Sequence, residues 1–354
     1  MKAFTVILIV RHGEETEKHR AERDFGHVPG VSRNLDLTEI HIARVFRHVL
    51  GLRTEPRGQN EHQVSSTPTL VINGVECEPY LTSDHRLMIE KGPEVLTGVT
   101  IIMKALGVTQ AVIGIEANKP DAISTLAGLS KEFAGISVVA LKVKYPQGGE
   151  KQLIKACTGR EVPSGGLPLD VGVVVQNVGT AFAVYEAVQK NKPLIERVVT
   201  VTGKSVSRPG NFLVRIGTPV TKLIEAAGGM PDDTGKVVNG GPMMGKALAM
   251  TEVPVTKGTS GIILFPEPES RREEIMPCIR CGKCSSACAM GLEPWLLSVL
   301  SEKAMFERAE TEKITDCMEC GACAYTCPAK RPLLDYIRLG KTTVIKMVRE
   351  RITK

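Results

Sequence analysis

Eight of the ten cysteines in this 354-residue chain fall into two copies of one spacing, Cys-x2-Cys-x2-Cys-x3-Cys. Three thiolates at such short intervals can hold one cubane iron-sulfur cluster, and in two-cluster ferredoxins the fourth ligand is the last cysteine of the other motif. The spacing therefore predicts two [4Fe-4S] clusters with crossed ligands. We assign Cys278, Cys281, Cys284 and Cys327 to one cluster, and Cys317, Cys320, Cys323 and Cys288 to the other.

The residues between the cysteines favour the same interpretation. Gly282 and Gly321 stand where the backbone must turn tightly, and Pro328 follows the last cysteine as in bacterial ferredoxins, whereas Ala289 stands in its place in the first copy. The alternative is a pair of four-cysteine zinc sites, because Cys-x2-Cys is also a zinc spacing. Zinc does not require a third cysteine after two residues and a fourth after three. Two clusters that share ligands in this way lie close together, which indicates an electron relay.

Length and composition limit the remaining possibilities. A chain of this size exceeds one usual hydrophobic core, so two or three domains are expected. The aromatic content is 4% and the net charge of +6 is not gathered in one run, which argues against a nucleic-acid partner. The apolar run at residues 3–10 is far shorter than the roughly 20 residues that span a bilayer. Without an export signal we expect reducing surroundings, where clustered thiols serve metal or redox chemistry.

The hydrophobic pattern predicts three folded domains after an atypical segment at residues 1–66, which holds six of the seven histidines. In residues 67–192, short Val- and Ile-rich runs alternate with helical patterns, as in a three-layer α/β domain with a parallel sheet. The runs are 70–75, 111–115, 136–143 and 172–175, and the helical patterns are 84–106, 120–133, 150–158 and 178–189.

The two later domains are predicted from a change of pattern. Residues 193–268 read as a small β-rich domain with strands near 197–203 and 212–216 and one helix at 220–227, and residues 266–270 read as a linker. Residues 269–354 form a helical domain in which each cysteine motif precedes a helix, at 293–308 and at 333–349.

Several motifs in order resemble the RnfC family, a component of the Rnf complex, the ferredoxin:NAD oxidoreductase that pumps ions across bacterial membranes. The likeness covers residues 69 to about 345. Its motifs are VINGVECEPYL at 71–81, DHR at 84–86, YPQGGEKQL at 145–153, QNVGT at 176–180, VNGGPMMG at 238–245 and TKGTSG at 256–261, together with both cysteine motifs.

The resemblance implies cofactors, partners and further site residues. The α/β domain is similar to the flavin-binding subunit of respiratory complex I, which implies bound FMN and reaction with NAD(H). The middle domain is similar to a ubiquitin-like β-grasp domain of the SLBB kind. The resemblance places flavin and nicotinamide contacts at Asn73, Glu76, Glu78, Gly148, Gly149, Glu150 and Asn177.

The function expected from this family is that of an electron-transfer subunit, and so of an oxidoreductase and translocase component. It would lie peripherally on the cytoplasmic face of the bacterial inner membrane, bound to other subunits and linked indirectly to ferredoxin. Two alternatives are a soluble flavin and iron-sulfur reductase, similar to cobalamin reductases, and a flavin-free scaffold that carries clusters. The scaffold arises because residues 1–66 lack the glycine-rich loop by which family members hold the FMN phosphate.

Overall fold

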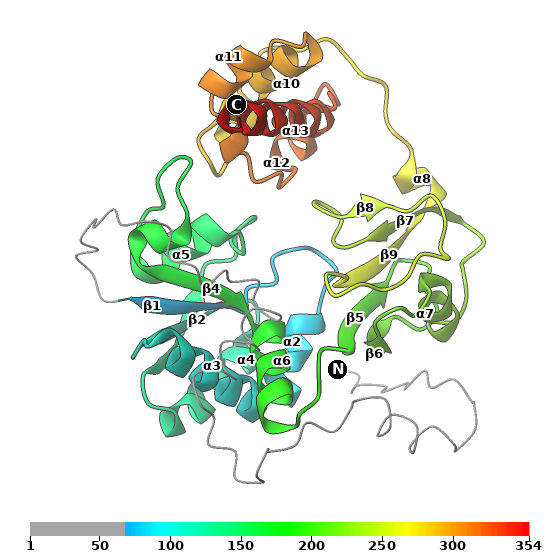
Figure 1. The fold of residues 1–354 in the computed structure, drawn as a ribbon. Helices are drawn as coiled ribbons and strands as arrows, with labels where there is room; N and C mark the ends of the chain where they lie inside the picture. Colours follow the sequence, from blue (N-terminus) through cyan, green and yellow to red (C-terminus); the bar gives the residue numbers. More distant parts are fainter. Residues whose placement is uncertain (1–67, 354) are drawn as a thin grey trace.

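The computed structural model describes residues 68–353 (Figure 1), so the atypical segment at 1–66 lies outside the described residues. The first domain contains a four-stranded sheet in the order β3-β2-β1-β4, and all of its strand pairs are parallel. The strands are rich in β-branched residues and are covered on both faces, which suits a parallel sheet. They are β1 (Thr69–Asn73), β2 (Ala111–Glu116), β3 (Ile136–Leu141) and β4 (Val173–Asn177).

Helices cover this sheet on both faces, giving the three layers that the sequence predicts. Leu70 and Ile72 of β1 point to one face and Val71 to the other, and all three are fully buried. The first face packs against α2 (Ser83–Glu90), α3 (Gly92–Leu106), α4 (Pro120–Leu129) and α6 (Val178–Gln189). The second packs against α5 (Glu150–Thr158). Single turns η1 (Ser130–Glu132) and η2 (Pro168–Val171) precede β3 and β4.

The second domain has the strand order of a β-grasp fold. Its mixed sheet runs β6-β5-β9-β7-β8, with β5 and β9 parallel and the other pairs antiparallel. One helix, α7 (Val220–Ala226), packs against the sheet through Leu223 and Ile224. The strands are β5 (Glu196–Thr202), β6 (Gly210–Arg215), β7 (Thr234–Asn239), β8 (Lys246–Ala247) and β9 (Gly261–Pro266).

The third domain is helical throughout the described residues and begins after an extended segment (Figure 1). Its longest helix, α13 (Leu333–Ile352), packs against α10 through Leu297, Leu300 and Ile337. The other elements are α9 (Lys283–Ser286), α10 (Pro294–Glu302), α11 (Phe306–Thr311), η3 (Ile314–Asp316) and α12 (Ala322–Tyr325). Along residues 68–353, no helix has both the length and the apolar content to cross a bilayer.

Three local predictions from the sequence are wrong. The helix predicted at 84–106 is two helices, because Lys91 leaves the helical region (φ −130°) and Pro93 starts the next helix. The helix predicted at 293–308 is also divided, with Ala304 in the left-handed region at φ 53°. The predicted linker at 266–270 includes a one-turn helix, α8 (Glu267–Ser270), and the extended connection follows it.

Candidate functional site

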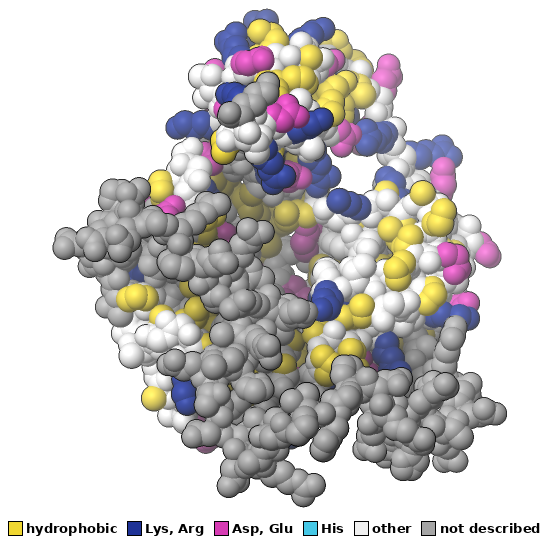
Figure 2. Space-filling model, in the orientation of Figure 1, with side chains coloured by type: hydrophobic (Ala, Val, Ile, Leu, Met, Phe, Trp, Pro, Cys, Tyr) yellow, Lys and Arg dark blue, Asp and Glu magenta, His cyan; other side chains and the backbone are white. Residues whose placement is uncertain are grey.

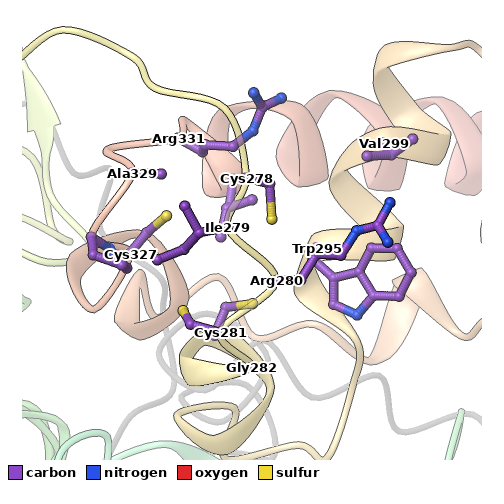
Figure 3. A pocket seen from close by; sticks show the side chains of 13 residues that line it. Cys278, Ile279, Arg280, Cys281, Gly282, Trp295, Val299, Cys327, Ala329 and Arg331 are labelled. Carbon is purple, nitrogen blue, oxygen red and sulfur yellow. The ribbon is translucent and has the colours of Figure 1, made fainter.

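The eight motif cysteines gather around two cavities in the helical domain, and each cavity combines residues of both motifs. One has a volume of about 790 Å³ and opens beside Trp295 (Figure 3). The last cysteine of each motif lies with the first three of the other motif. The first cavity is lined by Cys278, Cys281, Cys284 and Cys327, and the second by Cys288, Cys317, Cys320 and Cys323.

Each motif repeats the same backbone geometry around its cysteines. Gly282 (φ 73°) and Gly321 (φ 79°) are left-handed and lead into the one-turn helices α9 and α12, which carry the third cysteine of each motif. The residue before each second cysteine is also left-handed, at Arg280 (φ 55°) and Glu319 (φ 60°). Non-glycine residues rarely adopt this region, so its recurrence marks a loop whose shape is tightly set.

Electrostatics in the second cavity favour neutral thiols until a cation binds. Burial, followed by the neighbouring Cys317 and Cys320, raises the pKa of Cys323 to about 12. Backbone amides already point at sulfur, since Glu319 N lies 3.4 Å from Cys317 Sγ and Leu292 N lies 3.4 Å from Cys288 Sγ. Bound iron would supply the positive charge that makes such thiols ionise. This donor set therefore fits an iron-sulfur cluster.

A single metal ion fits less well. In residues 68–353, no group of three or more His, Cys, Asp or Glu side chains is close enough to hold one ion. A zinc ion would need its sulfur ligands at about 2.3 Å from one point. The cysteines instead surround a wider space, as a cubane requires.

A second polar group lies at the carboxyl edge of the parallel sheet, where Asn73 and Asn177 stand side by side in register on β1 and β4. The Asn73 side chain donates to Gly148 O (2.9 Å) and accepts from Val75 N (3.1 Å). Asn177 caps α6 by accepting from Gly179 N (2.7 Å) and also donates to Asn73 O (3.3 Å). The structure thus brings together three residues that the family resemblance selects.

The neighbouring glycines leave no room for side chains. A Cβ on Gly148 would lie 3.2 Å from Cys77 Sγ, and one on Gly149 would lie 2.1 Å from the Met318 methyl carbon of the helical domain. Gly149 is also the N-cap of α5, and Glu150 occupies its first turn with an exposed side chain. The α5 N-terminus therefore faces the helical domain across a close contact.

The Glu76 carboxylate is turned into the protein at this edge. It accepts from Asp84 N (2.9 Å) and His85 N (3.0 Å), and so caps α2. Burial, followed by the negative charge of Asp84, raises its pKa to about 7. The Glu76 backbone is left-handed at φ 46°, so the turn after β1 is held in a strained shape.

Lys119 supports this turn from below, and sequence reasoning did not select it. Its buried ammonium donates to Val75 O (2.9 Å), Glu76 O (3.3 Å) and the buried Glu116 carboxylate (3.2 Å). The three-residue spacing to Glu116 at the end of β2 is the one local signal, and such a pair is usually solvent-exposed.

Glu78 joins the three domains. Its carboxylate accepts from the backbone amides of Met243 (3.1 Å) and Met244 (2.8 Å) in the β-grasp domain. The Tyr145 hydroxyl lies 3.4 Å from the same carboxylate and 2.7 Å from Cys320 O, to which it donates. Sequence reasoning selected Glu78 as a cofactor contact, and no local signal announced these long-range partners.

The three domains correspond in order to three described families. Residues 51–186 match the Nuo51 FMN-binding domain, residues 198–247 match the SLBB domain, and residues 277–330 match the 4Fe-4S dicluster domain. The fold class expected from the sequence is confirmed. The chain is a multidomain protein of the flavin and iron-sulfur electron-transfer class.

The sequence relatives are more particular, and both are RnfC-type subunits of ion-translocating complexes. The chain is 50% identical over 275 residues to that of the proton-translocating ferredoxin:NAD(+) oxidoreductase complex of Clostridium ljungdahlii, covering 77% of this chain and 60% of the relative. It is 44% identical over 281 residues to that of the Na(+)-translocating complex of Acetobacterium woodii, covering 79% and 63%. From about residue 69 onward, the chain is thus related to the RnfC proteins. It spans about three fifths of the length of these two relatives.

A solved structure has the same fold over most of the chain. It is an NAD+-reducing [NiFe]-hydrogenase in the H2-reduced state, with a TM-score of 0.52 and 18% identity, covering 78% of this chain and 56% of that one.

Proposed function

We propose that this chain is an electron-transfer subunit of a membrane-bound, ion-translocating ferredoxin:NAD oxidoreductase. Electrons would pass between NAD(H), an FMN at the carboxyl edge of the parallel sheet and two [4Fe-4S] clusters, and then to another subunit. The observation that carries the proposal is the contact of the Tyr145 hydroxyl with Cys320 O, 2.7 Å long, because it joins the flavin-type domain to a cysteine site. The relatives' descriptions support the same assignment.

The residues of this chain would divide the work as follows. The two cysteine groups bind and bury the clusters, with backbone amides directed at sulfur. FMN would be held near Asn73, Gly148 and Asn177, with Glu76, Glu78, Gly149 and Glu150 shaping the same edge. A flavin exchanges a pair of electrons with a nicotinamide and single electrons with iron-sulfur clusters. The close approach at Gly149 excludes bulk from the gap between the two domains.

The partners and location follow from the same proposal. The chain would lie peripherally on the cytoplasmic face of the inner membrane, bound to further subunits, with ferredoxin reached indirectly. Fractionation of native membranes tests this part. Recovery with the membrane pellet and release by washing at high salt or high pH is expected. Recovery in the soluble fraction under gentle conditions would instead favour the soluble-reductase alternative.

The first experiment is anaerobic purification of the chain with its iron, sulfide and acid-extracted flavin measured together. We expect about eight irons and one FMN per chain, with absorbance bleaching on addition of NADH. Asn73→Ala removes the hydrogen bond that holds Gly148, so we expect it to lose flavin and bleaching but to keep its iron. Gln189→Ala, at the exposed end of α6, is the control. Eight irons without flavin or bleaching in the unaltered chain would contradict the relay and leave a cluster-carrying scaffold.

A further inference from the structure

The two cysteine sites are placed differently against the rest of the molecule. We call the site of Cys288, Cys317, Cys320 and Cys323 the inner site, and that of Cys278, Cys281, Cys284 and Cys327 the outer site. The inner site touches both other domains. Tyr145 donates to Cys320 O, and a Cβ on Gly321 would lie 2.9 Å from Met243 O of the β-grasp domain.

Further contacts hold the inner site against the α/β domain. The Asp316 carboxylate, next to Cys317, accepts from Gly165 N (3.0 Å) and from the Ser164 hydroxyl. The Gln152 side chain donates to Ala289 O (3.3 Å), next to Cys288. These contacts place the inner site beside the α5 end of the flavin-type domain.

The outer site has no such contacts in the described part of the chain. Along residues 271–286, all hydrogen bonds and ion pairs run to residues 267–335, within the helical domain and the short helix before it. Cys278 and Cys281 are exposed, whereas Cys323 of the inner site is buried. One site is thus enclosed between domains and the other faces outward.

The rim of the outer site combines apolar and basic side chains. Ile279 is 68% exposed and Trp295 is 45% exposed, and both stand at the mouth of the cavity (Figure 3). Arg280 and Lys283 are also exposed, and neither forms an ion pair with any described residue. Hydrophobic and basic side chains lie close together on this domain (Figure 2). One carboxylate is near, Glu293, which accepts from Trp295 Nε1 (2.8 Å).

We infer that electrons enter and leave the chain at the outer site, and that this face docks an acidic redox protein. The inference rests on the proposed function and specifies its partner side. Apolar and aromatic groups with arginine are enriched at interfaces, and unpaired cations attract a partner of opposite charge. The step moves one electron and breaks no bond: the outer cluster is oxidised as the partner's centre is reduced, or the reverse. The inner site carries the electron between the outer site and the flavin.

The test is a charge reversal at the rim, with matched acceptors. The full chain, reconstituted anaerobically, is reduced with dithionite, desalted and mixed with oxidised rubredoxin, a small acidic redox protein, or with cytochrome c, a basic one. The variant is Arg280→Glu/Lys283→Glu. Its control is Lys104→Glu/Lys131→Glu, which reverses two exposed, unpaired lysines of the α/β domain.

We expect the rim variant to reduce rubredoxin about tenfold more slowly at low salt, with less than a twofold change in the control, because electrostatic steering changes association rates by factors of about 10 to 1,000. The difference should vanish near 0.5 M salt, where charges are screened. Equal rates in the rim variant and the control would overturn the inference, as would faster transfer from the unaltered chain to cytochrome c than to rubredoxin.

A redox titration followed by electron paramagnetic resonance separates docking from a change in the clusters. Unchanged cluster potentials with slower rubredoxin reduction support the inference. A shifted potential with equal slowing toward both acceptors contradicts it. Because dithionite reduces the clusters without flavin or NADH, the result stands even when NADH fails to bleach the chain, so failure of the proposed function is recognised separately.

Discussion

Replacing Lys119 by methionine should destabilise the flavin-type domain more than any surface change. The substitution leaves the Glu116 carboxylate buried without its cation and removes the donor to Val75 O and Glu76 O. Breaking a buried ion pair on one side costs about 3–5 kcal/mol, because the remaining charge is uncompensated. We therefore expect the unfolding free energy to fall by about 4 kcal/mol.

A second variant shows where that loss comes from. In Lys119→Met/Glu116→Leu no charge is left unpaired, so the loss should shrink to about 1–2 kcal/mol, the value for the unmade backbone hydrogen bonds. Lys155→Met is the matched control: its ion pair with Glu161 is exposed on both sides, and such pairs contribute less than about 1 kcal/mol.

The assay is urea unfolding followed by circular dichroism, with hydrogen exchange measured on peptides covering residues 69–90. Exchange should rise at the turn after β1 in Lys119→Met, because that turn loses its support. The reasoning is refuted when Lys119→Met costs no more than Lys155→Met, or when the double variant is at least as unstable as the single one.

Three further predictions concern packing, pH and iron. Gly98→Ala should cost about 1–3 kcal/mol in urea unfolding, because its Cβ would lie 1.9 Å from a backbone oxygen of α6, whereas Gly128→Ala, in open space on α4, should gain up to about 1 kcal/mol; equal effects would contradict this. Glu76 holds its proton more tightly in the folded chain (pKa about 7) than unfolded (4.5), so stability should fall as pH rises between these values, by up to about 3 kcal/mol, and Glu76→Gln should flatten that slope. An unchanged slope would refute the assignment. Cys77→Ala and Cys157→Ala should each keep about eight irons by colorimetric assay, because both thiols pack in the α/β domain, and loss of iron would show that one of them is a ligand.

The sequence predicts best where a local signal ends an element. The helices at 150–158 and 178–189 have the bounds that were expected, because Gly149 precedes one and Asn177 caps the other. It predicts less well where a hydrophobic pattern runs through a break. The apolar face of 84–106 continues past Lys91, and Gly92-Pro93 divides a helix that periodicity alone joins.

The site divides in the same way. The grouping of Cys327 with the first motif follows from a spacing rule, and the structure has that grouping, while its role in binding iron stays a prediction. The partners of Glu78 lie about 165 residues away in the chain and carry no pattern of their own. Lys119 was missed because lysine is seldom buried, so composition directs attention elsewhere. The flavin contacts and the domain limits at 192 and 268 stay predictions.

The junction at Glu78 has a mechanical consequence. Electron tunnelling slows steeply with distance, so a relay needs one well-fixed gap more than it needs a rigid molecule. Here one carboxylate and one phenol fix the β-grasp turn and the Cys320 loop to the edge of the parallel sheet. The extended connection at residues 271–277 can then change shape without altering that gap. Mutations that lengthen the connection should be tolerated, while a loosened junction should slow transfer with both cofactor sites intact.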